Sequence, residues 1–263
     1  MAHAAATLNS WTKRFFRDFR QGLLAIAASM SCGLTADTTH AQQNLFNVPS
    51  AEITDAYTMF FQEQMNFASQ SQSNTTIDYG LGNSFEVGVN ILNLNMIPMA
   101  GSQDSPNTPL AMLNAQKGFR LGEKILVGVG TQIGEKTAGS IHDVRLADFN
   151  WMTFAMELPD KRGRLYAGPC YTNVVYGGVP AEPLGYMLGY DIPVVEGKFN
   201  LMGDYISGTG YNSVAVLGAV FRLGKCWQLS LGGQLPSPHS NNSYGGVIEF
   251  TYVACKPEGK LYP

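Results

Sequence analysis

The feature that most constrains this fold is an alternation of apolar and polar residues, in segments of about ten residues, that begins at Tyr57. Between Phe85 and Ile91, for example, Phe, Val, Val and Ile alternate with Glu, Gly and Asn. A period of two places successive side chains on opposite faces of a β-strand. Glycine recurs throughout, with 29 residues in 263, and disfavours helices. The sequence therefore predicts an all-β fold.

The spacing of these segments predicts how the strands are connected. Short connectors follow the even-numbered segments, and most of the odd-numbered segments are followed by longer ones. Outer-membrane barrels have an even number of strands, short periplasmic turns on one rim and longer external loops on the other. We therefore predict a closed antiparallel up-and-down transmembrane β-barrel. Its strands are expected at 57–67, 73–81, 84–94, 109–120, 123–133, 147–158, 163–176, 185–194, 197–206, 212–223, 226–234 and 243–254.

The composition of the polar faces indicates which side of the barrel meets lipid. Only 14% of the residues are charged, and the polar faces carry mostly Gln, Asn, Ser, Thr and Gly rather than Lys and Glu. This composition suits a hydrated lumen inside an apolar outer band. Segments 147–158 and 212–223 are apolar on both faces and fit the pattern poorly. The alternation predicts a lumen lined by Gln62, Gln64, Asp78, Glu86, Asn90, Lys124, Asp191, Asp204 and Glu249.

Aromatic residues near the strand ends are candidates for girdles at the two membrane interfaces. Ordinary strand propensity would give a similar enrichment, because aromatic residues favour sheets. The girdle candidates are Tyr57, Phe67, Tyr79, Phe85, Phe119, Trp151, Tyr166, Tyr176, Tyr186, Trp227, Tyr244 and Tyr252.

Three stretches of sequence carry a resemblance to known proteins. Asn44–Ser50 (NLFNVPS), Phe60–Gln64 (FFQEQ) and the hairpin Asp78–Gly88 (DYGLGNSFEVG) resemble the bacterial outer-membrane β-barrel class. They are also similar in style to the putative transporter barrels of the phenol-degradation MetA-pathway family. The resemblance implies a 12-stranded outer-membrane transporter. Such barrels usually end on an aromatic residue, whereas here the eleven-residue tail Val253–Pro263 follows Tyr252.

The N-terminal residues 1–41 have the composition of a secretory signal peptide. Four basic residues between Lys13 and Arg20 precede the apolar run Gly22–Met30, and Ala41 ends a small-x-Ala cleavage pattern. A lipoprotein signal at Cys32 and an uncleaved amphipathic helix are the alternatives. After cleavage, residues 42–56 would form an irregular lead-in, residues 57–254 the barrel and residues 255–263 a C-terminal tail.

The cysteines predict a disulfide bond rather than a metal site. Cys226 opens one predicted strand and Cys255 follows the next, so antiparallel pairing brings them together in the oxidising periplasm. Cys170 would stay unpaired. Because the cysteines have no CxxC spacing and His142 and His239 are not spaced as a ligand pair, we expect no metal or cofactor.

Catalytic motifs are sparse. After signal removal only His142 and His239 remain, both in presumed external loops, with Ser237, Ser240 and Ser243 near the second. A Ser–His nucleophile needs an oriented base and acid, so a barrel hydrolase is disfavoured.

We expect a non-enzymatic, narrow pore or transporter for small solutes in the outer-membrane bilayer. A net charge of -3 disfavours nucleic-acid binding. The acidic lumen residues either select cations or pair with basic side chains, and the loop 95–108 is the best candidate for a plug. The alternatives are a partner-binding barrel with a closed lumen and a secreted soluble barrel that binds an apolar ligand.

Overall fold

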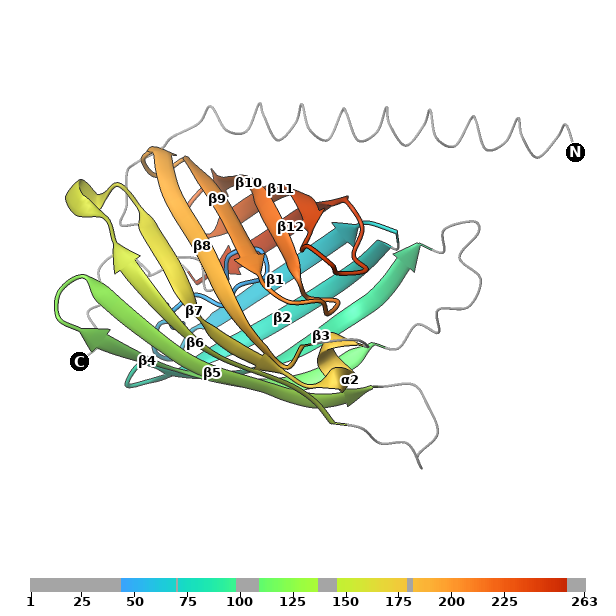
Figure 1. Ribbon diagram of the computed structural model, residues 1–263. Coiled ribbons are helices and arrows are strands. Elements are labelled where there is room, and N and C mark those ends of the chain that lie inside the picture. Colours follow the sequence, from blue (N-terminus) through green and yellow to red (C-terminus); the bar gives the residue numbers. More distant parts are fainter. Residues whose placement is uncertain (1–43, 70, 98–108, 137–145, 179–181, 255–263) are drawn as a thin grey trace, which may run out of the picture. The chain divides into compact units, whose positions relative to one another are not determined.

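The computed structural model describes residues 44–69, 71–97, 109–136, 146–178 and 182–254, and they form a closed barrel of twelve strands (Figure 1). The predicted fold class is therefore confirmed. The strands are β1 (Met59–Phe67), β2 (Ser71–Gly82), β3 (Phe85–Ile97), β4 (Leu110–Leu121), β5 (Ile125–Lys136), β6 (Leu146–Glu157), β7 (Arg164–Thr172), β8 (Leu184–Val195), β9 (Phe199–Ile206), β10 (Val214–Leu223), β11 (Trp227–Pro236) and β12 (Gly245–Val253).

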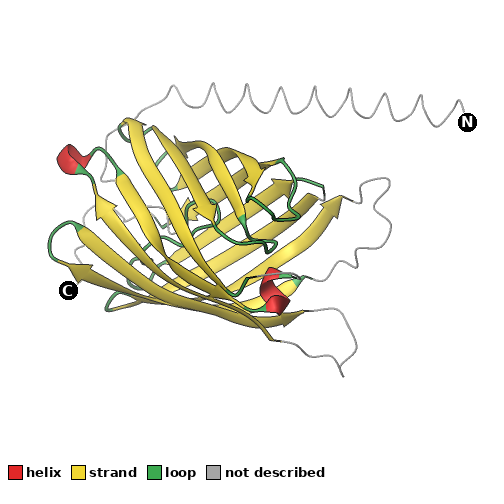
Figure 2. Ribbon diagram, viewed as in Figure 1, coloured by secondary structure: helices red, strands yellow, loops and turns green. Residues whose placement is uncertain are grey.

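Each strand pairs antiparallel with its neighbours in sequence, and β1 closes the barrel by pairing with β12. Met65 lies opposite Ile248 and Gln64 opposite Glu249 across this closing pair. Closure satisfies the backbone N–H and C=O groups that an open sheet edge would expose to lipid. Figure 2 shows how completely strands dominate the described chain.

The strand limits agree with the sequence prediction to within a few residues, except at the end of β7. That strand was expected to reach Tyr176, but it ends at Thr172. Asn173 caps the short helix α2 (Val174–Gly177), because its side-chain oxygen accepts the N–H of Tyr176 at 3.0 Å. The cap turns the chain away from the sheet.

The connectors define two rims. The short-turn rim holds the connectors after β2, β4, β6, β8 and β10, including the 3₁₀ turn η2 (Pro159–Lys161), together with both ends of the barrel chain. The long-loop rim holds the others, of which residues 98–108 and 137–145 lie outside the described residues. The candidate plug loop 95–108 and His142 therefore lie mostly or wholly outside them too. No helix among the described residues is long and apolar enough to cross a membrane.

The barrel is apolar outside and largely polar inside. Outward-facing Leu113 and Ile133 are 64% and 44% exposed, whereas inward-facing Thr153 and Glu249 are fully buried. A soluble protein shows the opposite arrangement, because exposing apolar area to water is costly. The outer surface is that of a membrane-spanning barrel.

Candidate functional site

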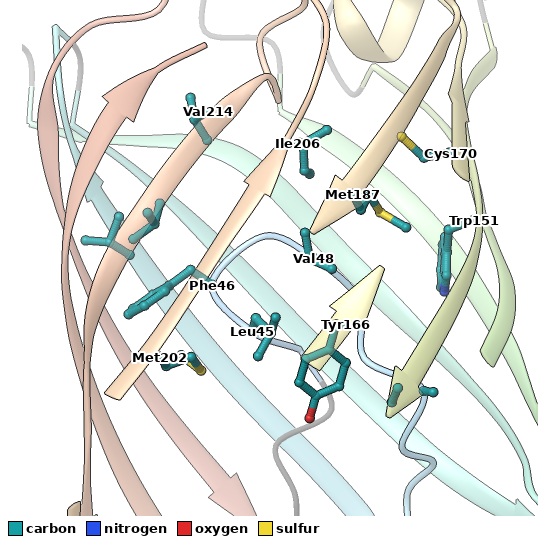
Figure 3. Close-up of a cluster of buried hydrophobic side chains, with 14 of the residues drawn as sticks. Leu45, Phe46, Val48, Trp151, Tyr166, Cys170, Met187, Met202, Ile206 and Val214 are labelled. Atoms are coloured by element: carbon teal, nitrogen blue, oxygen red, sulfur yellow. The ribbon is translucent and has the colours of Figure 1, made fainter. Parts of the chain in front are cut away.

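Residues 44–55 of the lead-in lie inside the barrel and are the central feature of the lumen. The first of these residues form a tight turn in which Asn44 bridges to Pro49 and the N–H of Leu45 donates to the carbonyl of Val48 at 2.9 Å. We call Asn44–Pro49 the lumen turn. Figure 3 shows Leu45, Phe46 and Val48 of this turn surrounded by side chains of the barrel strands.

One side of the lumen is apolar where it meets the lumen turn. Leu45, Phe46 and Val48 are 1% exposed or less and belong to one continuous hydrophobic cluster. The barrel strands contribute most of the rest of this cluster, and we call its inward-facing residues on β6 to β10 the apolar wall. These residues are Phe149, Trp151, Tyr166, Met187, Met202, Ile206, Val214 and Val216. Burying side chains of this size stabilises a contact by roughly 1.5–3 kcal/mol each.

Glycines shape the recess that receives the lumen turn. A Cβ atom at Gly218 of β10 would lie 2.7 Å from Cζ of Phe46, and one at Gly232 of β11 would lie 3.0 Å from the same atom. A Cβ atom at Gly189 of β8 would collide with Cδ1 of Leu45. The absence of side chains at these positions lets Leu45 and Phe46 approach the sheet itself.

A buried carboxylate anchors the backbone of the lumen turn. Oδ2 of Asp204, in β9, accepts the N–H of Val48 at 2.8 Å and also the N–H of Asn47. Hydrogen bonds to an ionised acceptor are stronger than those between neutral groups. Asp204 is 3% exposed, so water does not compete freely for it.

Amide side chains from opposite strands hold the other faces of the lead-in. Nδ2 of Asn44 donates to Gln62, and Nε2 of Gln64 donates to Asn47, both at 3.3 Å. Nε2 of Gln116 donates to the carbonyl of Ser50 at 3.0 Å. The lead-in is thus held from β1 and β4 as well as from the apolar wall.

The lower part of the lead-in reaches the short-turn rim through a half-buried ion pair. Nη1 of Arg164 lies 2.6 Å from Oε1 of Glu52, and the hydroxyl of Tyr166 donates to the same oxygen at 3.3 Å. Burial raises the pKa of Glu52 above the ordinary value of a glutamate, and the guanidinium of Arg164 acts in the opposite direction. Further along, the N–H and hydroxyl of Thr54 both donate to Oε2 of Glu86, at 2.7 and 2.8 Å.

A cavity of about 330 Å³ opens beside this lower part of the lead-in. Its lining includes the acidic residues Glu52 and Asp55 and the basic residues Arg120 and Arg164. The cavity is large enough for a small polar solute, and its wall carries both signs of charge.

The structure buries most of the predicted lumen residues. Gln62, Gln64, Asp78, Glu86, Asn90, Asp204 and Glu249 are 6% exposed or less. Asp78 and Asn90 both accept from Nδ2 of Asn114, at 2.8 and 3.1 Å, and Glu249 accepts from Ser230 at 3.0 Å. These acidic side chains therefore hydrogen-bond to neutral groups, an arrangement that was not predicted from the sequence.

Two of the predicted lumen residues lie differently. Asp191 is only half-buried, where its Oδ1 accepts from Asn200 at 2.7 Å. Lys124 is exposed in the turn between β4 and β5, so the prediction that it faces the lumen is wrong. The strand β5 begins at Ile125, and the preceding residues of this connector form the rim turn.

Three girdle candidates also lie elsewhere than expected. Trp151 and Tyr166 are 6% and 3% exposed and face the lumen, where Nε1 of Trp151 donates to Gln116 at 2.8 Å. Tyr176 stacks on Phe149 with ring centroids 5.2 Å apart, from helix α2. These aromatic residues cover or form the apolar wall instead of facing lipid.

The cysteines partly match their prediction. Cys226 is disulfide-bonded, and Cys170 is a free, buried cysteine. The N–H of Val253 donates to the carbonyl of Cys226 at 2.8 Å, which brings the chain two residues before Cys255 beside Cys226. Cys255 lies outside the described residues, so its pairing with Cys226 stays a prediction.

The loop between β11 and β12 holds the serines considered as nucleophiles. The hydroxyl of Ser237 pairs with that of Tyr205 at 3.1 Å, and the hydroxyl of Ser240 donates to the Ser237 carbonyl at 2.8 Å. His239 is exposed. The hydroxyl groups of Ser237 and Ser240 thus have partners other than His239. Among the described residues, no three His, Cys, Asp or Glu side chains cluster as metal ligands.

Comparisons with known proteins place this fold. No protein-family model and no curated protein matches the sequence. The KdgM porin is similar in structure, with a TM-score of 0.55 and 6% identity over 73% of this chain and 98% of that chain. KdgM porin in complex with disordered oligogalacturonate gives a TM-score of 0.51 and 9% identity over the same shares. The COG4313 outer membrane channel from Pseudomonas putida F1 gives 0.49 and 11%, over 83% of this chain and all of that chain.

These similarities concern the fold. At such low identity, the two KdgM structures establish that the chain has the barrel architecture of an outer-membrane porin, as the resemblance in its sequence implies. Function does not follow from a shared fold and must be argued from the lumen itself.

Proposed function

We propose that this protein is a non-enzymatic outer-membrane channel for small solutes, narrowed by its own lead-in. The observation that carries the proposal is a closed barrel with an apolar exterior and buried polar residues such as Gln62, Asp78 and Asn90 in its lumen. A wall of this kind suits the passage of hydrated solutes. Twelve strands enclose a lumen between the filled interior of eight-stranded barrels and the open channel of sixteen-stranded ones.

The proposed path runs beside the lead-in. The lumen turn contacts strands on both sides of the barrel, and the cavity at the short-turn rim lies at its lower end. A solute would pass only as far as the lead-in allows. Movement of the lead-in therefore would set the conductance.

A disulfide tether tests this proposal directly. A Cβ atom at Gly118 would lie 2.8 Å from Cγ1 of Ile53, the position that a cysteine sulfur at residue 53 could take, so an Ile53→Cys/Gly118→Cys pair is within disulfide reach in a Cys170→Ala background. We expect small wild-type conductance in planar bilayers, a lower conductance in the oxidised double variant, and recovery on reduction. Each single variant controls for reduction of the native disulfide at Cys226. A tethered variant that conducts as the wild type does would contradict the proposal.

The filled lumen also favours a second candidate, a partner-binding barrel that does not conduct. This candidate predicts no current from the wild type or from a variant with a weakened lead-in, such as Phe46→Ala. Outer-membrane fractionation and heat-modifiable gel migration test the location that both candidates share.

A further inference from the structure

The lumen turn is bound to the barrel in the manner of a ligand. Its hydrogen bonds are internal, from Leu45 to Val48, or are made with side chains of the barrel such as Asp204 and Gln64. None of these contacts is part of the strand ladder. Withdrawal of the turn would therefore leave the pairing of the twelve strands intact.

The recess behind the turn fits branched and aromatic side chains. Gly189 admits Leu45, while Gly218 and Gly232 admit the ring of Phe46. The surrounding Met187, Met202, Val216 and Val220 are 3% exposed or less. Methionine and valine side chains form no directional bonds to apolar groups, so the free energy of binding to them follows the apolar area that is buried.

The polar end of the recess fits two neighbouring N–H groups. Oδ2 of Asp204 accepts the backbone N–H groups of two consecutive residues, Asn47 and Val48. A buried carboxylate needs such donors, because it is costly to bury without them. A short peptide with apolar side chains would present two such consecutive N–H groups to Asp204.

An uncovered apolar wall would be unfavourable in a water-filled channel. If the lumen turn withdraws for conduction, Met187, Met202 and Val216 come into contact with water. The apolar area then exposed opposes withdrawal, unless a solute of similar chemistry covers the wall. The same residues can thus both hold the turn and select the solute that replaces it.

We propose that the recess is a binding site for short apolar peptides, and that the lumen turn occupies it as a tethered competitor. The inference rests on the proposed channel function, because the peptide must enter the lumen. The peptide would place a leucine-like and a phenylalanine-like side chain against the glycines and would donate two N–H groups to Asp204.

Calorimetric titration of the full chain in detergent micelles tests this inference. The probe is N-acetyl-Leu-Phe-Asn-Val-amide, and the control probe is the same peptide N-methylated on the Asn and Val nitrogens. In a Leu45→Ser/Phe46→Ser variant, where the turn competes poorly, we expect binding at least tenfold tighter than in the wild type. Loss of two hydrogen bonds to a charged acceptor is expected to weaken binding of the control probe at least tenfold.

Two further variants keep the test decisive. Asp204→Asn, added to the serine variant, is expected to weaken binding of the first probe about tenfold. If the serine variant does not fold, as judged by the absence of heat-modifiable migration, Phe46→Ala takes its place. Equal affinity in wild type and variant, or equal affinity for both probes, would overturn the inference. Current without peptide binding would overturn the inference but not the channel, whereas binding without current in any variant would overturn the channel.

Discussion

The barrel has a polar inner wall and an apolar inner wall, and the side chains of the two walls are stabilised in different ways. On β1, β2, β3, β11 and β12, buried polar side chains form hydrogen bonds with one another, as when Ser230 donates to Glu249 at 3.0 Å. On β6 to β10, the apolar wall has few such groups and is covered by Leu45, Phe46 and Val48 of the lead-in. The polar wall can face water unaided, whereas the apolar wall requires a cover.

This difference assigns the lead-in its role. If the whole lumen wall were polar, a chain segment inside it could bury little apolar area. Its hydrogen bonds to the wall would replace hydrogen bonds to water, so their net contribution to binding would be small. The apolar wall supplies the burial that keeps the lumen turn in place, and Asp204 fixes its backbone. Four predictions probe the contrast between the walls.

The largest effect is expected from Phe46→Ala, which removes the ring that fills the recess at Gly218 and Gly232. Truncating a buried phenylalanine costs about 3–5 kcal/mol, so release of the lumen turn should become more than a hundredfold easier. Conductance in planar bilayers should rise, and maleimide should label Ala51→Cys faster in a Cys170→Ala background. The matched truncation on the polar side is Gln64→Ala. If both variants opened the lumen equally, the contrast between the walls would be unsupported.

Asp204→Asn should have the next largest effect. The amide keeps the shape of the carboxylate but loses its charge, and hydrogen bonds to charged groups contribute about 1.5–3 kcal/mol. We expect release of the turn to become about tenfold easier, measured by the same labelling rate. Asp78→Asn is the control on the polar wall, since Asp78 bonds to Asn114 rather than to the lead-in. An Asp78→Asn variant that labels as fast as Asp204→Asn would count against a specific anchor.

The architecture was predictable from sequence because alternation is a local property. Residues 85–91 alternate strictly, and the strand β3 that contains them exposes Val89 and Ile91 on one face and buries Glu86 and Asn90 on the other. The parity of short and long connectors then gave the topology. The end of β7 was missed because the cap at Asn173 is a single side-chain hydrogen bond, and no alternation marks it.

The lumen site was harder to predict because its parts are distant in sequence. Leu45 and Gly189, or Asn47 and Asp204, meet only once the barrel has closed. One signal was present, however. Segments 147–158 and 212–223 were apolar on both faces, and the inward-facing Phe149, Trp151, Val214 and Val216 account for this. An apolar inner face in a membrane barrel indicates that something other than water covers it.

Gly189→Ala should have a smaller effect than either anchor variant. The added methyl group collides with Leu45, and overpacking of this kind costs about 1–3 kcal/mol, at the low end where a flexible side chain can move. We expect modestly faster labelling of Ala51→Cys. Gly233→Ala is the matched control, because a Cβ atom there meets nothing within 4 Å. Equal behaviour of the two alanine variants would show that Leu45 does not pack as described.

The smallest effect is expected from pH, acting through Glu52 at the lower end of the lead-in. In the packed lead-in burial raises the pKa of Glu52, whereas a released lead-in would return Glu52 to water and to its ordinary pKa. Packing therefore takes up protons between these two pKa values. The packed state is favoured most below the ordinary pKa of a glutamate, and this advantage is lost as pH rises through the raised pKa. Conductance should accordingly fall as the solution is acidified through this range.

Two variants separate this effect from titration of the other acids in the lumen. Glu52→Gln should remove the part of the pH dependence that belongs to the lead-in. Arg164→Gln should move it to higher pH, because the guanidinium lowers the pKa of Glu52. Single-channel recordings across the pH range measure both. A conductance that rises on acidification, or a pH dependence that survives unchanged in Glu52→Gln, would show that the ion pair at the short-turn rim does not regulate the lead-in.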